Sequence, residues 1–201
     1  LLRARGIQLL VDCGLFQGYK QLRLRNWAPL PLKPAAISAV VLTHAHIDHS
    51  GYLPLLAHNG FAGKVYCSEG TRDLCRVLLP DAGRLQEEEA EYANRRGFSR
   101  HKPAKPLYTE RDAKRALALL HPVDFGGRLD VQGVALTLLP GGHILGASIA
   151  SFELGDARIV FSGDLGRLED AVMAPPARVR NADYLVVEST SGFPASGDLL
   201  L

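Results

Sequence analysis

Apolar and β-branched residues gather in short runs near the start of the chain, and each run ends at a polar loop. Residues 7–11 and 37–43 carry such runs and predict two buried strands. Residues 51–58 predict a short helix that an Asn-Gly pair ends, and residues 64–68 predict a third strand. The first part of the chain therefore alternates strands and helices.

A helical period follows in the middle of the chain. Residues 69–79 and 81–96 predict two consecutive helices separated at Pro80, because proline removes a backbone hydrogen bond and clashes with the preceding turn. Thr109 and Asp112 have the spacing of a capping box and predict the start of another helix.

Short apolar segments separated by Gly, Pro and Asp fill the rest of the chain. They predict strands over 121–125, 129–131, 134–139, 148–154, 158–162 and 184–188. Helices between strand-rich ends fit an α/β layered sandwich better than a pure doubly wound sheet. No apolar run approaches membrane-spanning length, so we predict no membrane partner.

Composition adds few constraints. The 201 residues, 47% of them hydrophobic, make room for one good-sized core, and the net charge of +2 excludes little. Cys13, Cys67 and Cys75 form no Cys-x-x-Cys pair, so we interpret them as reduced packing residues of a cytoplasmic protein. The chain begins with Leu and lacks a signal-peptide pattern, which predicts a clipped start.

One six-residue segment, the hexad His-Ala-His-Ile-Asp-His at 44–49, holds three of the seven histidines and directly follows the second predicted strand. Alternate side chains of an extended segment point the same way, so we expect His44, His46 and Asp48 to converge. His49 breaks the alternation, and a turn there would bring it beside the others. Histidine and carboxylate groups are ligands that zinc prefers, so the hexad predicts a metal site.

Two further candidate ligands stand at predicted strand ends. His143 lies in a glycine-rich loop after the strand at 134–139, and Asp164 lies in a Gly-Asp-Leu-Gly loop after the strand at 158–162. Glycine allows the backbone to approach closely at such positions. We interpret both residues as metal ligands.

Basic residues gather between positions 95 and 115, a segment that contains eight Arg and Lys residues and only two acidic residues. Such a segment can hold phosphates, and it can equally be a solvated surface balanced by the acidic run at 87–91. The candidates for phosphate contact are Arg95, Arg96, Arg100, Lys102 and Lys105.

These features resemble a known family. The hexad, a later histidine and a later aspartate, each at a strand end, are similar to the metallo-β-lactamase fold, an αββα sandwich. The segments at 12–18 (Asp-Cys-Gly-Leu-Phe-Gln-Gly), 92–97 (Tyr-Ala-Asn-Arg-Arg-Gly) and 187–190 (Val-Glu-Ser-Thr) resemble its β-CASP nucleases. That branch includes bacterial and archaeal RNA-processing enzymes and the mRNA 3′-end endonuclease. The resemblance runs from Ile7 to about Thr190.

The resemblance implies a centre of two zinc ions that cleaves RNA phosphodiester bonds through a metal-activated hydroxide. One zinc would be held by His44, His46 and His143, the other by Asp48 and His49, with Asp164 bridging both. Single-stranded RNA is the implied partner, and it would fit the basic segment. A homo-oligomer of the full-length protein is a further possibility.

Two more acidic residues gain roles from the resemblance. Asp12 would fix the hexad loop by hydrogen bonds rather than bind metal. Glu188 would orient a histidine or share a proton with it. The implied catalytic residues are therefore Asp48, Asp164 and Glu188.

The resemblance also implies an incomplete fold. Residues 1–190 would form a partial metallo-β-lactamase domain that lacks its first strands, and residues 191–201 an irregular tail where an absent β-CASP domain would begin. No histidine follows His143, so the branch's last zinc ligand and its general acid would lie outside the chain. Ser191 stands where the family usually has Tyr. We expect the chain to bind the second zinc weakly and to cleave RNA poorly.

Two alternatives stay open. One is a small-molecule hydrolase of the same fold, such as a thioesterase, a lactonase or a glyoxalase-like enzyme, although such an enzyme has no evident use for the basic segment. The other is a non-catalytic β-CASP scaffold that binds RNA or protein, although scaffolds of that kind usually lose metal ligands that this chain retains.

Overall fold

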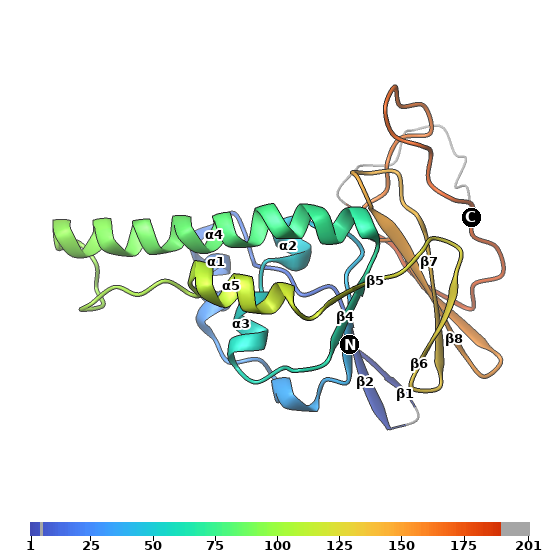
Figure 1. Cartoon of the computed structure of the whole chain (residues 1–201), viewed down its shortest axis with the longest axis horizontal. Coiled ribbons are helices and arrows are strands. Elements are labelled where there is room, and N and C mark those ends of the chain that lie inside the picture. Colours follow the sequence, from blue (N-terminus) through green and yellow to red (C-terminus); the bar gives the residue numbers. More distant parts are fainter. Residues whose placement is uncertain (5, 190–201) are drawn as a thin grey trace.

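Two five-stranded sheets form the centre of the computed structural model, which describes residues 1–4 and 6–189 (Figure 1). The first sheet has the order β1 (Leu2–Ala4), β2 (Ile7–Val11), β3 (Ala39–Val41), β4 (Lys64–Cys67) and β5 (Leu120–Pro122). The second has the order β10 (Tyr184–Val186), β9 (Ala157–Phe161), β8 (Ser148–Leu154), β7 (Val134–Pro140) and β6 (Arg128–Val131).

The two sheets differ in strand direction. In the first, β2 to β5 are parallel and only β1 is antiparallel to its neighbour, because helical crossovers connect β3, β4 and β5. In the second, β6 to β9 form an antiparallel meander, and β10 pairs with β9 in the parallel direction. The carboxyl ends of β7, β9 and β10 therefore lie at the same end of the second sheet.

The helices gather on one side of the first sheet (Figure 1). They are α1 (Lys20–Leu24), α2 (Ile47–Ser50), α3 (Leu53–His58), α4 (Glu69–Arg96) and α5 (Glu110–Leu117), with 3-10 turns at Arg25–Trp27 and Pro34–Ala36. The longest, α4, begins beside the sheet edge and runs outward past α5.

Alternating side chains of β3 separate two apolar clusters. Val40 belongs to the cluster between the first sheet and the helices, whereas Ala39 and Val41 belong to the cluster between the two sheets, where they join Leu136 and Phe152. The predicted α/β sandwich is therefore confirmed, as three layers of helices, sheet and sheet. In the described part of the chain no helix covers the outer face of the second sheet, so the fourth layer of the predicted αββα sandwich is missing there.

The prediction of two helices separated at Pro80 is wrong, because α4 continues through that residue. Proline removes one hydrogen bond of the helix, but packing on both sides of it holds the axis together. Cys75, Leu79 and Gly83 are all buried, and a Cβ at Gly83 would stand 2.7 Å from the backbone nitrogen of Glu110. Tertiary contact with the start of α5 thus outweighs the local preference of proline.

Replacement of Pro80 by alanine is expected to raise the free energy of unfolding by about 1–2 kcal/mol, a part of the roughly 3 kcal/mol that separates proline from alanine inside a helix. Urea titration followed by circular dichroism measures the change. Glu89→Ala, at an exposed position of the same helix, serves as the control and should stay within about 0.5 kcal/mol of the starting protein. A Pro80→Ala variant no more stable than the starting protein would contradict this explanation.

Other differences are local. β1 and α1 were not predicted, since three and five residues with few apolar side chains give little periodic signal. β5 ends at Pro122 rather than at 125. The predicted tail at 191–201 lies outside the described residues, as does Thr190, so the predicted division into domains stays a prediction.

The three cysteines are buried and free, as predicted for packing residues. Burial raises the pKa of Cys13, and it raises the pKa values of Cys67 and Cys75 to about 12, so all three thiols stay protonated at neutral pH. None belongs to the group of candidate metal ligands found among the described residues. Within the same residues, no helix combines the length and the apolar character needed to cross a membrane.

Candidate metal centre

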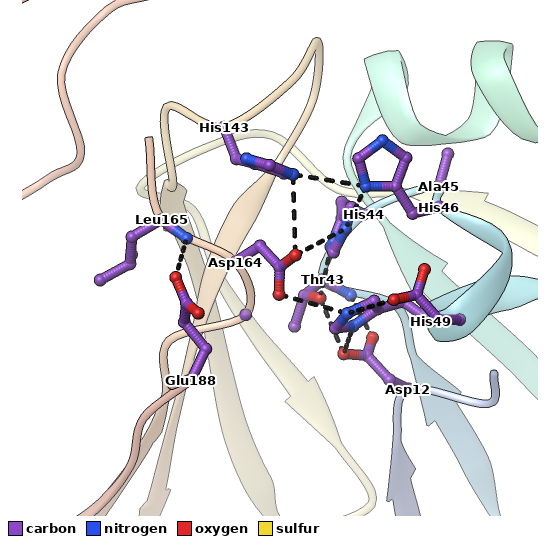
Figure 2. Close-up of polar contacts among 12 residues, drawn as sticks. Asp12, Thr43, His44, Ala45, His46, His49, His143, Asp164, Leu165 and Glu188 are labelled. Carbon is purple, nitrogen blue, oxygen red and sulfur yellow. Dashed lines mark hydrogen bonds and ion pairs between the residues drawn. The ribbon is translucent and has the colours of Figure 1, made fainter. Parts of the chain in front are cut away.

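The candidate site lies where strands of both sheets end. Asp12 follows β2 and the hexad follows β3, both from the first sheet. His143 follows β7, Asp164 follows β9 and Glu188 follows β10, all from the second sheet. Figure 2 shows His44, His46, His49 and His143 gathered around Asp164, with Glu188 to one side and turned toward Leu165. Residues that lie far apart in the sequence thus meet where these strands end.

Four side chains form the centre of the cluster. Ligand atoms of His44, His46, His143 and Asp164 all lie within 4.8 Å of one another. The Nδ1 atom of His46 is 3.0 Å from Nε2 of His44 and 3.3 Å from Nε2 of His143. The Oδ2 atom of Asp164 is 3.8 Å from Nε2 of His44 and 3.6 Å from Nε2 of His143. Ligands at tetrahedral zinc stand about 3.3 Å apart, so the group has suitable dimensions.

Proton positions in the buried His44 ring favour a cation between these groups. The Thr43 hydroxyl donates to Oδ2 of Asp12 over 2.8 Å, so it accepts from Nδ1 of His44 over 3.1 Å. The unprotonated Nε2 of His44 then points at His46 and Asp164 (Figure 2). Burial and the neighbouring histidines lower the pKa of His44 to about 3, which keeps the ring in the neutral form that binds metals.

His49 lies on the other side of Asp164. Its Nδ1 donates to Oδ2 of Asp12 over 2.8 Å, while its Nε2 is 3.2 Å from Oδ1 of Asp164. Burial lowers the pKa of His49, but the hydrogen bond and charge of Asp12, with the charges of Asp164 and Asp48, outweigh burial and raise it. The two oxygens of Asp164 therefore face different histidines, an arrangement suited to a carboxylate that bridges two ions.

The extended geometry expected as far as Asp48 is wrong after His46, because the turn expected at His49 begins two residues earlier. α2 begins at Ile47, so Asp48 and His49 lie on the first turn of a helix rather than on an extended segment. The Asp48 side chain is 53% exposed, and its carboxylate is 4.0 Å from Nε2 of His49. It stands outside the four-residue group, and its assignment as a ligand stays a prediction.

Asp12 links the parts of the site without joining the ligand group. Its carboxylate accepts from the Thr43 backbone N–H over 2.7 Å, from the Thr43 hydroxyl and from His49. Its backbone has a φ of 56°, a conformation that non-glycine residues adopt rarely and that functional sites often contain. The predicted role of Asp12 in fixing the hexad loop agrees with these contacts. Thr43, which carries the link from Asp12 to His44, was not predicted.

Asp12→Asn is expected to weaken metal affinity about 10–100-fold, the usual loss when an outer partner of a ligating histidine is altered. An amide has only one acceptor oxygen, so it cannot satisfy Thr43 and His49 together. Metal titration with a competing chromophoric chelator measures the affinity. Asp130→Asn, at an exposed position of β6, is the matched control. Unchanged affinity in Asp12→Asn would show that Asp12 does not orient His49.

The His143 loop is fastened to the start of α4. The hydroxyls of Ser68 and Thr71 donate to the carbonyl oxygen of Gly146 over 2.5 and 2.9 Å. Gly146 has a φ of 76°, and a Cβ there would stand 2.2 Å from the Thr71 backbone nitrogen. Ser68 also caps α4 by accepting from Thr71 N–H. Nothing in the local sequence indicated these contacts, because the partners are more than 70 residues apart.

Glu188 lies at the margin of the site. Its backbone N–H donates to the Ser162 hydroxyl over 3.0 Å, and its Oε1 is 3.5 Å from the Leu165 backbone nitrogen (Figure 2). These contacts fix the segment after β10 against the loop that carries Asp164. The proposed action of Glu188 on a histidine stays a prediction.

The predicted phosphate contacts lie far from the metal centre. They occupy the last turn of α4 and the loop that follows, whereas the first turn of α4 contacts the His143 loop. A 28-residue helix is about 42 Å long, and Figure 1 shows α4 unbroken between these ends. The basic segment therefore does not line the candidate metal centre.

The layered fold, with three histidines and an aspartate clustered where strands of both sheets end, is typical of the metallo-β-lactamase class of metal-binding proteins. Residues 1–189 match the model of the Metallo-beta-lactamase superfamily. The chain belongs to that superfamily.

Curated relatives narrow the resemblance. The chain is 34% identical to "Ribonuclease TTHA0252" of Thermus thermophilus over 96% of its own length and 40% of that protein's. It is 32% identical to "Transcription termination factor FttA" of Methanococcus maripaludis, over 92% of its own length and 28% of that protein's. It is 28% identical to "Cleavage and polyadenylation specificity factor subunit 3-I" of Arabidopsis thaliana, over 94% of its own length and 25% of that protein's. These matches confirm the resemblance to the β-CASP nucleases, and the chain spans less than half the length of these relatives.

Solved structures support the fold alone. MEM-A1, a subclass B3 metallo-beta-lactamase from a soil metagenome library, aligns with 92% of this chain and 70% of its own at a TM-score of 0.52. The two sequences are 16% identical, so this similarity says nothing about the substrate.

Proposed function

We propose that the chain carries the zinc centre of an enzyme that hydrolyses RNA phosphodiester bonds. The observation that carries this proposal is the similarity to "Ribonuclease TTHA0252" across 96% of the chain. The six predicted ligands of this chain, His44, His46, Asp48, His49, His143 and Asp164, all lie within its first 189 residues. Because the match covers only 40% of that relative, the activity of the whole protein is also part of the proposal.

The donor set fits zinc, since it combines imidazole nitrogens with carboxylate oxygens in a group of tetrahedral dimensions. His44, His46, His143 and Asp164 would hold one ion. His49 and Asp48, with the second oxygen of Asp164, would hold another. When bound, zinc supplies an activated water at neutral pH and positive charge for the oxygens of the scissile phosphate.

The chain's own residues prepare the site for that chemistry. Thr43 and Asp12 fix the protonated nitrogens of His44 and His49, so that the free nitrogens face the centre. Asp164 presents one oxygen to each side of the site. The carboxylate of Asp48, 53% exposed, is the most exposed of these groups and lies on the solvent side of His49.

The experiment compares RNA with small substrates. Purified chain is analysed for bound metal by mass spectrometry, then incubated with end-labelled single-stranded RNA in the presence of zinc, manganese or a chelator. We expect slow cleavage that zinc supports and the chelator removes. Hydrolysis of a thioester or a lactone by metal-loaded protein that leaves RNA intact would contradict the proposal and favour the small-molecule alternative.

A further inference from the structure

The outer end of α4 exposes aromatic and basic side chains together. We define the α4 tip as residues 92–105, which include the last turn of the helix and part of the loop that returns to α5. Tyr92 and Phe98 are 49% and 66% exposed, and their rings stand 5.9 Å apart at 61°. The guanidinium of Arg96 lies 5.7 Å from the centre of the Tyr92 ring. Figure 1 shows this end of α4 extending beyond the other helices.

The cations of the tip have no acidic partners. Among the described residues, no carboxylate lies within 4.0 Å of the basic groups of Arg95, Arg96, Arg100, Lys102 or Lys105. Four cations elsewhere on α4 and α5 do form such pairs, namely Arg72, Arg76, Arg84 and Lys114, whereas Arg111 and Arg115 of α5 form none among the described residues. In the described part of the chain, these five cations are therefore free of direct ion pairs.

Side chains of α4 hold the loop of the tip in one path. The Asn94 amide donates to the Ala104 carbonyl over 3.0 Å and accepts from the Ala104 N–H over 2.7 Å. Gln86 accepts from the Leu107 N–H over 3.1 Å. A loop fastened in this way presents its exposed groups at little entropic cost to a ligand.

We propose that the α4 tip is an accessory binding site for single-stranded nucleic acid, separate from the metal centre. Exposed aromatic rings offer faces on which bases stack, and unpaired cations beside them attract the phosphates between those bases. Charge alone would fit many anions, whereas the exposed Tyr92–Phe98 pair beside the cations fits a ligand with planar rings. The choice of RNA over DNA rests on the proposed function.

The position of the tip determines which RNA could use both sites. The first turn of α4 contacts the His143 loop through Thr71, and the tip begins 21 residues later, about 32 Å away along the helix. A strand stacked at about 3.4 Å per nucleotide needs about 9 nucleotides to cover that distance. The tip would hold a part of the RNA remote from the bond that is cleaved.

Binding is tested without cleavage, by fluorescence anisotropy with labelled oligouridylate of about 20 nucleotides, longer than the site size of one such module. The double variant Tyr92→Ala, Phe98→Ala is expected to raise the Kd about tenfold or more, because alanine removes the ring on which a base would stack. Val77→Ala, Leu85→Ala is the matched control, since it removes two exposed apolar side chains of the same helix outside the tip. It should bind as the starting protein does.

A second variant tests the charge. Arg95→Gln, Arg100→Gln, Lys102→Gln should lower the slope of log affinity against log salt concentration by about two, at about 0.7 per phosphate contact. Its control, Arg3→Gln, Arg23→Gln, Arg76→Gln, removes three exposed cations outside the basic segment and should leave the slope unchanged. Circular dichroism confirms that each variant is folded.

Several results would overturn the inference. One is wild-type affinity in both tip variants, and another is an equal loss in the controls. A third is displacement of the oligouridylate by a polyglutamate peptide at equal charge concentration, which would show a surface for acidic proteins. Duplex RNA bound as tightly as the single strand, with no effect of Tyr92→Ala, Phe98→Ala, would show attraction by charge alone.

The outcome is separable from that of the proposed function. His46→Ala alters the metal centre and should leave binding at the tip unchanged. If the chain cleaves RNA but the tip variants bind oligouridylate as the starting protein does, this inference is wrong and the proposed nuclease function stands. If the tip variants bind more weakly, but the chain binds metal and cleaves no RNA, the inference stands and the proposed nuclease function is wrong.

Discussion

Replacement of Asp164 by alanine is expected to remove most of the bound metal and to lower RNA cleavage at least about 1,000-fold. The two oxygens of Asp164 face different histidines, at 3.2 Å from His49 and 3.6 Å from His143, so no other residue of the cluster reaches both sides. Without the metal, the pKa of the attacking water rises from about 7 toward 15.7, and little hydroxide remains at neutral pH. Metal content by mass spectrometry and cleavage of labelled RNA measure the two effects.

Asp156→Ala provides the matched control, because Asp156 is an exposed aspartate in the turn before β9 whereas Asp164 follows the other end of that strand. It should retain both metal and activity. Full metal content in Asp164→Ala would contradict the bridging role. Loss of metal with unchanged cleavage would instead show that the observed nuclease activity belongs to a contaminant or to another site.

Gly14→Ala is expected to lower the free energy of unfolding by more than about 3 kcal/mol, or to prevent folding altogether. A Cβ at Gly14 would stand 1.5 Å from the carbonyl oxygen of Asp48, which is backbone and cannot rotate away. The loop after β2 lies directly on α2 here, since the N–H of Cys13 donates to the His49 carbonyl over 2.7 Å. Urea titration gives the stability, and the yield of soluble protein gives the outcome if folding fails.

Gly127→Ala is the control for this substitution. Gly127 has no positive φ, and the nearest heavy atom to its Cβ would be the Asp124 carbonyl oxygen at 3.3 Å. We expect a change of less than about 1 kcal/mol there. A Gly14→Ala protein as stable as Gly127→Ala would mean that the contact between the loop and α2 is looser than the structure shows.

Much of the candidate site could be predicted because most of its candidate ligands follow strands. The polar residue after an apolar run is fixed at a sheet edge by the strand before it, and this placed His44, His143 and Asp164 from the sequence alone. The fold class followed from the same runs of apolar residues and the helices between them. Local periodicity is a sufficient signal where one strand or helix determines the position of a side chain.

The rest depended on contacts between distant segments. The helical turn at Asp48 replaced the expected extended backbone, and the passage of α4 through Pro80 relies on packing against α5. The fastening of the Gly146 carbonyl by Ser68 and Thr71 joins positions more than 70 residues apart. The distance between the basic segment and the metal centre likewise follows from the length and direction of α4, which charge in a sequence does not reveal.

The ligands of the candidate centre come from both sheets, His44 and His46 from the first and His143 and Asp164 from the second. Any ion held there ties the layers together at one edge, so metal binding and folding are thermodynamically linked. At a free metal concentration about 100 times the Kd, the folded state gains about 2.7 kcal/mol over one that binds nothing. The supply of metal would then determine how stable the folded chain is.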